Sequence, residues 1–200
     1  MAEMHRVSGV KLTGILSSHA RWLAHGVTAG KRADLSGTDL SGANLSGVNL
    51  TEANLSGANL EGVNFIDADL SGANLTSADL TGATLSGAKM IMADLSGANL
   101  DKANLWGCTL IMANLSGASF IDASLIMANL SGVKLIGAHL IRTTLNKAKL
   151  HVADLTGADF AGANLTGADC TGTDFSVANL MGAILPSGET FSVEGGGIGG

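Results

Sequence analysis

The stretch ADLSGTDLSGANLSG, residues 33–47, contains three copies of a five-residue unit that continues through most of the chain. From residue 33 to residue 187 the sequence consists of 31 consecutive units without an insertion or a deletion. The middle residue of each unit, here called the centre, falls at every multiple of five from Leu35 to Leu185, and 25 of the 31 centres are leucine. A repeat this regular decides the architecture before any other feature is considered.

The other positions of the unit are nearly as constant. Two positions before the centre the residue is alanine in 24 of 31 units, and Asn or Asp directly precedes the centre in 21 units. Glycine stands two positions after the centre in 18 units. A period of five fits neither a regular helix nor a plain strand. We therefore expect the large and the small apolar residue to point inward, while Gly and Asn or Asp form a tight turn in nearly every unit.

These units resemble the pentapeptide-repeat proteins, whose signature is A(D/N)LXX. Residues 33–37, Ala-Asp-Leu-Ser-Gly, and residues 43–47, Ala-Asn-Leu-Ser-Gly, match it directly, and the resemblance covers about three-quarters of the chain. It implies an all-β fold: a right-handed quadrilateral parallel β-helix with four units per coil and nearly eight coils. With strands about 4.8 Å apart, the rod would be about 37 Å long.

The ends of such a solenoid need covers, because they would expose unpaired backbone groups and apolar columns. Residues 13–25 fit a short helix in which Leu16, Ala20 and Leu23 share one face. We expect this helix to cover the N-terminal end, with Trp22 folded onto the first coil.

The chain is expected to have three parts: a leader with a helical cap, the β-helix and a Gly-rich tail. After Pro186, Thr190, Phe191 and Val193 are expected to form a strand over the last coil. The leader, HARWL followed by GKRADLSG, is similar to leaders of bacterial and bacteriophage pentapeptide-repeat proteins, which implies a place in the cytoplasm or in a virion. The three parts are residues 1–32, 33–187 and 188–200.

Charge and hydropathy exclude several classes of partner. The formal net charge is −6, which argues against a general nucleic-acid binder. No apolar run approaches the ~20 residues that span a bilayer, and the first residues show no secretory signal. We therefore expect a protein partner, the simplest being a second copy of the chain, with no nucleic acid and no membrane.

No constellation of catalytic residues is present in the sequence. The five histidines are scattered and are expected to lie on the solvated surface, and the recurring aspartates follow from the repeat. Cys108 and Cys170 are expected to be reduced structural cysteines. A tightly packed Leu/Ala interior also leaves no cavity for a substrate. We expect no enzyme, no cofactor, no metal site and no small-molecule substrate.

Large apolar residues interrupt the Ser, Thr and Gly background of the outward positions in the middle coils. With 20 residues per coil they stack in columns on three consecutive faces, which predicts an exposed patch that binds a protein partner. The alternative is that these residues reflect sequence drift on a tolerant surface, or that Ile and Met side chains of successive coils cover one another. The residues are Ile91, Met92, Trp106, Ile111, Met112, Ile121, Ile126, Met127 and Ile141.

A second departure is a stretch without acidic residues between Asp122 and Asp154. It is interpreted as a solvated face or as a docking site for an acidic partner. Its cations are Lys134, Arg142, Lys147 and Lys149.

Two functions follow from these features. The first is a non-enzymatic structural or scaffold protein that makes protein–protein contacts through a rigid rod, with a phage capsid or tail as one possible setting. The second is a DNA mimic that binds the type II topoisomerase gyrase, as the family resemblance implies. A net −8 on the repeats over about 37 Å is sparse against the one charge per ~1.7 Å of duplex DNA, which favours the first.

Overall fold

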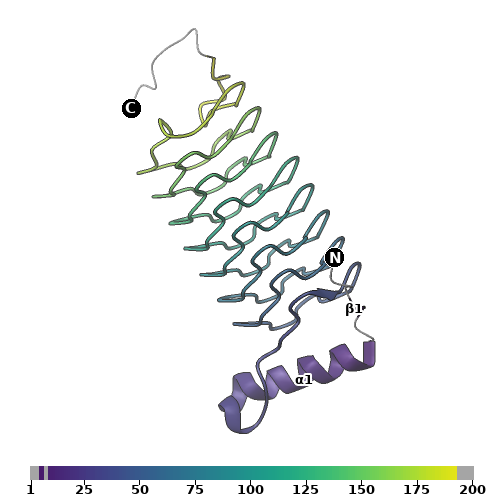
Figure 1. Ribbon diagram of the computed structural model, residues 1–200. Helices are drawn as coiled ribbons and strands as arrows, with labels where there is room; N and C mark the ends of the chain where they lie inside the picture. The colour runs from purple at the N-terminus through teal and green to yellow at the C-terminus, as the bar shows by residue number, and fades with distance from the viewer. Residues whose placement is uncertain (1–4, 7–8, 193–200) are drawn as a thin grey trace.

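The computed structural model describes residues 5–6 and 9–192. The repeats form a right-handed quadrilateral parallel β-helix, as predicted, and Figure 1 shows its coils stacked into a rod. Parallel bridges join residues that are 20 positions apart, from Asp34–Asn54 to Asn164–Ile184. One coil therefore takes 20 residues, and its four sides are one repeat unit each.

Each side of a coil is held by the coils before and after it. The Leu100 N–H donates to the carbonyl of Ser119 at 2.7 Å, and the Asn99 N–H donates to the carbonyl of Ala78 at 2.9 Å. The side chain of Leu100 lies in the core and is fully buried. The same holds for every other centre except three near the C-terminal end, which are partly buried. These are Cys170, Phe175 and Leu185.

The corners between the sides are β-turns with a left-handed residue. In the turn after Leu100, the Ala103 N–H donates to the Leu100 carbonyl at 3.1 Å, and Lys102 has a φ of +59°. A positive φ at this position is the signature of a type II turn, which favours glycine. The Asn99 Oδ1 accepts a hydrogen bond from the Asp101 N–H at 3.0 Å. The same bond recurs at other units with Asn or Asp before the centre, which confirms that these residues suit the turn.

Four helices and strands lie at the N-terminal end, the last of them within the first coil. They are β1 (His5–Arg6), α1 (Gly9–His25), the 3₁₀-helix η1 (Gly26–Thr28) and β2 (Thr38–Asp39). The two strands pair in parallel, with His5 opposite Thr38. In Figure 1, α1 lies across the N-terminal end of the rod, as the prediction of a capping helix required.

The buried face of α1 differs from the predicted one. The helix begins at Gly9 rather than at residue 13, and Leu12, Ile15 and Leu16 pack against the core. Ala20, which was predicted to face the coil, is exposed. The longer helix places its inward stripe one turn earlier, so the stripe continues to His19 instead of to Ala20.

His19 is the residue that joins α1 to the first coil. It is fully buried, its Nδ1 accepts a hydrogen bond from the Ala33 N–H at 3.0 Å, and its ring stacks on Trp22 with centroids 5.6 Å apart. The prediction of a solvated surface position was therefore wrong for this histidine. Ala33 opens the first repeat and has no preceding repeat unit, so the imidazole supplies the acceptor that its N–H needs.

The last coil departs from the regular pattern. The Gly157 N–H donates to the carbonyl of Val177 at 2.8 Å, one residue beyond the partner that the repeat dictates. Thr190 forms an antiparallel bridge with Ile184, and the Phe191 N–H donates to the Ala183 carbonyl at 2.7 Å. Of the C-terminal strand that was predicted, these two contacts are present, while Val193 lies outside the described residues. The division at residues 32/33 and 187/188 stays a prediction.

We predict that Leu105→Asp lowers the free energy of unfolding by several kcal/mol, because it buries a carboxylate without a partner in a fully buried position. Asn104→Asp in the same unit is the control. It keeps the Oδ1 that accepts the Trp106 N–H, so its stability stays close to that of the wild type. Thermal melts of both variants decide this, and a wild-type melt for Leu105→Asp contradicts the inward assignment.

The neutral form of His19 is predicted to hold the helical cap. Burial lowers the pKa of His19 from 6.5, helped by Arg32 and opposed by the Thr51 carbonyl and Glu52. The unfolded chain therefore takes up a proton below about pH 6.5 that the folded chain resists, and stability falls as the pH drops through this range. The wild-type Tm should fall between about pH 8 and pH 5, while the Tm of His19→Gln changes less. If the Tm values of the two proteins depend equally on pH, this interpretation is contradicted.

Candidate protein-interaction surface

The corners of the rod carry the side chains that distinguish one coil from the next. Eleven of the residues two positions after a centre are not glycine and still adopt a positive φ between 53° and 60°. Their side chains lean toward the following coil. A Cβ built at Gly132 would lie 3.5 Å from the Cγ of Met112, for example, and one at Gly162 would lie 3.5 Å from the Cγ of Arg142. Side chains at corners therefore extend along the surface of the rod.

Four of the nine predicted patch residues are strongly exposed. The exposed fractions are 64 % for Met92, 51 % for Trp106, 62 % for Met112 and 53 % for Met127. The other five are half-buried, and they occupy the first turn position, where residues of consecutive coils stack. These are Ile91, Ile111, Ile121, Ile126 and Ile141. The exposed area thus comes mainly from Met and Trp, while the isoleucines are half-buried.

Seven of the nine residues border one side of the rod, here called the Thr109 face, whose outward residues are Lys89, Thr109 and Asn129. Bridges between Lys89 and Thr109 and between Thr109 and Asn129 place these three in one column. The corner that precedes the face carries Trp106, Ile126 and Met127, and the corner that follows it carries Ile91, Met92, Ile111 and Met112. The structure does not bring Ile121 and Ile141 to this face; they lie one corner earlier.

Two further exposed apolar residues lie in the same corner columns, and the sequence did not predict them. Val152 is 71 % exposed and lies in the column of Met92 and Met112, two coils beyond Met112. Ile66 is 37 % exposed and lies in the column of Trp106, two coils before it. The signal in each case was a large apolar residue at a turn position, isolated from the cluster in the middle coils.

The four cations of the basic stretch lie on four different parts of one coil. Lys134 and Lys149 occupy outward positions on two different sides, and Arg142 and Lys147 occupy two different corners. The Arg142 guanidinium binds both carboxylate oxygens of Asp122 at 2.7 Å, and this hydrogen-bonded pair lowers the pKa of the Asp122 carboxyl.

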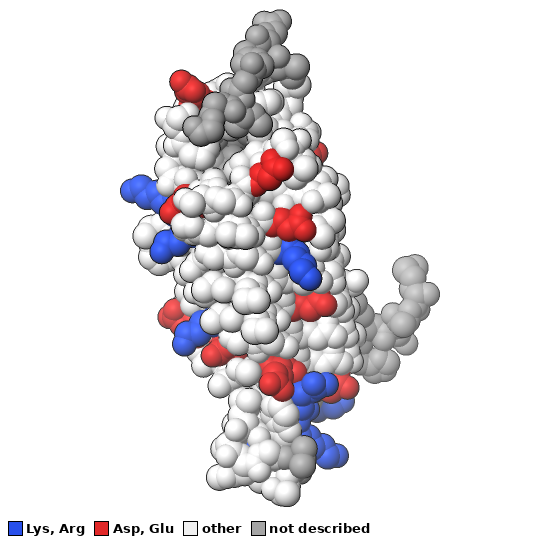
Figure 2. All heavy atoms as spheres, turned by 90° about the vertical axis from the view of Figure 1, so that its left-hand side faces the viewer, with Lys and Arg blue, Asp and Glu red and all other residues white. Residues whose placement is uncertain are grey.

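Two of the other three cations also lie close to an acidic residue of a neighbouring coil. Lys134 lies near Asp154 and Lys149 near Asp169, and each cation contributes to lowering the pKa of that carboxyl. On the middle of the rod in Figure 2, blue and red side chains accordingly lie side by side.

Of the described residues, none form a group of three or more His, Cys, Asp or Glu that could hold a metal ion. Both cysteines are free, and burial raises the pKa of Cys108 to about 12 and that of Cys170 to about 11, so neither thiol ionises near neutral pH. Within the part of the chain that the structure describes, no helix is long and apolar enough to cross a membrane.

Comparison with known proteins identifies the family that has this architecture. The family described as pentapeptide repeats (8 copies) matches residues 31–65, 64–101, 98–135, 127–162 and 158–186. The chain belongs to the pentapeptide-repeat family. A search of curated proteins found no match.

Three solved structures of two pentapeptide-repeat proteins illustrate the likeness. HetL from the cyanobacterium Nostoc sp. strain PCC 7120, which is involved in regulating heterocyst differentiation, is 36 % identical; the alignment covers 80 % of this chain and 86 % of that chain, with a TM-score of 0.52. Full-length QnrB1, a plasmid-mediated fluoroquinolone resistance protein, is 22 % identical over 72 % of this chain and 76 % of its own, with a TM-score of 0.67. A trypsin-treated QnrB1 variant is 25 % identical over 76 % and 79 %, with a TM-score of 0.63. Neither protein is described as an enzyme.

We predict that Met112→Gly stabilises the rod, because glycine adopts the positive φ of 56° found at Met112 without the clash that a Cβ causes. The expected gain is about 1 kcal/mol, or roughly 2–4 °C in Tm for a chain of this size. The reverse change, Gly117→Met, introduces a side chain where a Cβ meets nothing within 4 Å, so it isolates the backbone strain and should lower the Tm by a similar amount. A lower Tm for Met112→Gly would show that packing on the neighbouring coil outweighs the strain.

Proposed function

We propose that this pentapeptide-repeat protein is a non-enzymatic scaffold that binds a protein partner through the Thr109 face. The observation that carries the proposal is the exposure of Trp106 and three methionines at the two corners that border one side of a rigid rod. Trp and Met are enriched in the cores of protein interfaces, and Trp is a frequent hot spot.

The backbone supports the same conclusion. Met92, Met112 and Met127 each occupy a left-handed position where glycine would be unstrained. Residues held in such conformations cluster at binding sites, where the strain is part of the function. The rod also presents its corners on coils whose backbone is bonded on both sides, so little conformational entropy is lost when a partner binds.

The simplest partner is a second copy of the chain. If the Thr109 face binds the same face of that copy across a two-fold axis, the two chains close a symmetric dimer. The centre of the Thr109 face is uncharged, with Thr109 and Asn129 between Lys89 and Lys149 in one outward column, so two copies can meet at the centre without like-charge repulsion there. The leader HARWL–GKRADLSG supports a phage particle as the setting, and the cytoplasm is the other setting we consider.

The second candidate is a DNA mimic that binds gyrase. The likeness to QnrB1, described as a fluoroquinolone resistance protein, favours it. The pairing of cations with acids along the middle of the rod opposes it, since Arg142 neutralises Asp122 and Lys134 lies near Asp154. Gyrase supercoiling with and without a quinolone tests this candidate, and no effect at micromolar protein eliminates it.

The scaffold proposal predicts that truncating the Thr109 face weakens association without loss of fold. We expect Trp106→Ser combined with Met112→Gly to lower the mass of the assembly in high salt, or to weaken binding of the natural partner at least about tenfold. Sedimentation in about 1 M salt is the measurement, because screening leaves an apolar contact intact.

The control is Ile136→Ser, which changes an exposed apolar residue at a corner that does not border the Thr109 face. It should leave both the mass and the partner affinity unchanged. The proposal fails if the Trp106/Met112 variant keeps wild-type mass and affinity while its circular dichroism shows a folded β-helix. The apolar side chains of the face would then only cover one another along the rod.

A further inference from the structure

The two ends of the rod carry opposite charge. Between residues 9 and 32 there are four Lys or Arg and no Asp or Glu, whereas residues 151–192 hold five Asp or Glu and no Lys or Arg. In Figure 2, blue side chains gather around the end that α1 covers, with some red side chains beside them, and red side chains without blue lie near the C-terminal end. The cations are Lys11, Arg21, Lys31 and Arg32, and the acids are Asp154, Asp159, Asp169, Asp174 and Glu189.

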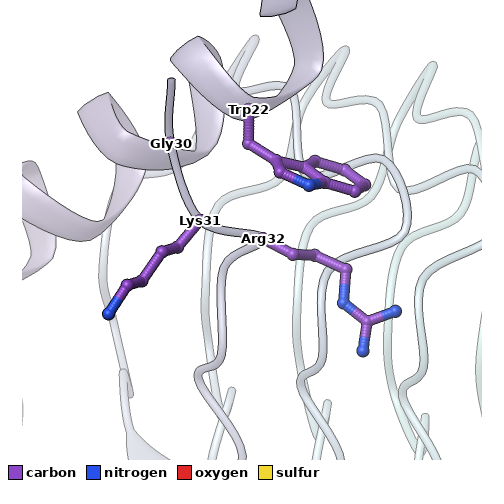
Figure 3. A pocket seen from close by; sticks show the side chains of 4 residues that line it. All are labelled: Trp22, Gly30, Lys31 and Arg32. Carbon is purple, nitrogen blue, oxygen red and sulfur yellow. The ribbon is translucent and has the colours of Figure 1, made fainter. Parts of the chain in front are cut away.

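The basic end is hollowed where α1 meets the first coil. Two shallow grooves share Lys31 and Arg32, which lie on the segment that links α1 to the first repeat. Trp22 and Gly30 complete one groove, and in Figure 3 the Trp22 ring and the Arg32 side chain extend in the same direction while Lys31 points away. The second groove is lined by Lys11 and also by Asp34 at its inner edge.

The segment with these cations is fixed in place. The Lys31 N–H donates to Ser18 Oγ at 3.1 Å, and Arg21 Nε donates to the Ala29 carbonyl at 3.2 Å. Gly30 crosses α1 so closely that a Cβ there would lie 2.1 Å from the Ser18 carbonyl oxygen, which only glycine permits. The cations are therefore presented by a backbone that has little freedom left to lose on binding.

The acidic end presents fixed carboxylates beside apolar side chains. Asp174 accepts hydrogen bonds from the N–H and the hydroxyl of Ser176, and these bonds lower the pKa of its carboxyl, which keeps it ionised. Asp169 is held in the same way by Thr171. Val177 and Met181 are exposed on the same last coil, so the end offers both charge and apolar area.

We propose that the acidic C-terminal end of one copy docks on the basic N-terminal end of a second copy. Asp174, Glu189 and their neighbours then face Lys31, Arg32 and Lys11, and Met181 meets the region around Trp22. Like ends repel each other, so the contact has one polarity. Because the two surfaces differ, the contact does not close on itself and leads to linear chains of rods.

This contact is independent of the Thr109 face, and its response to salt separates the two. Attraction between exposed charges is screened within about 10 Å at 0.1 M salt and within about 3 Å at 1 M. Sedimentation of the wild type should therefore show masses that grow with concentration at about 0.01 M salt and a loss of these species at about 1 M. A wild type whose mass is the same in both buffers overturns the proposal.

Charge-reversal variants test which ends of the rod form the contact. Lys31→Glu with Arg32→Glu should abolish growth at low salt, and so should Asp174→Lys with Glu189→Lys. A 1:1 mixture of these two variants restores growth, because each then offers an end that complements the other. The control, Lys102→Glu with Lys147→Glu, changes the net charge as much as the first variant does, but in the middle of the rod, and should assemble like the wild type.

Each outcome is decisive. Restoration in the mixture, with growth lost in each variant alone, supports head-to-tail docking. Growth that survives reversal at either end, or that the mid-rod control also loses, contradicts it. Thermal melts of all variants confirm that each is folded before its mass is interpreted.

Discussion

The turn that closes each five-residue side is the constraint on which this molecule depends. Its second residue must adopt a positive φ, and the hydrogen bond from the N–H of the following residue to the centre's carbonyl holds it there. The corner lets the chain change direction after every centre, so that consecutive centres all point to one axis. Coils of 20 residues then lie in register, and the backbone amide of every centre from Leu35 to Leu150 donates to the next coil.

The same constraint separates the inside of the molecule from its surface functions. The two inward positions of a unit are fixed by packing, and the outward strand position favours the acceptor that suits the turn. The corners vary most freely. A left-handed residue at a corner sends its side chain along the rod, and Met92, Met112 and Met127 use this geometry to place apolar surface where glycine is the unstrained choice. The ends vary for another reason, since no coil lies beyond them.

The repeat predicted the fold and most of the buried residues because each inward position admits few residue types. It also predicted the corner columns, since residues 20 apart must stack. It did not predict that the isoleucines would be half-buried while the methionines took the exposure, because the methionines occupy the second turn position, where a left-handed φ directs the side chain along the rod. His19 was missed for a different reason. A helix face identified by hydropathy alone does not include a polar residue such as His19, whose Nδ1 accepts the Ala33 N–H. The open end of a solenoid nevertheless implies that this N–H needs an acceptor.

The sign of φ at the non-glycine corners is the quantity that tests this account most directly. NMR carbon chemical shifts and residual dipolar couplings of selectively labelled protein report it for Met92, Met112 and Met127. The account predicts a left-handed backbone at all three, like that of the glycines at equivalent corners such as Gly97 and Gly117. A right-handed or extended backbone at these methionines would contradict it, because the corners would then close in another way and the side chains would not lie where the Thr109 face requires them.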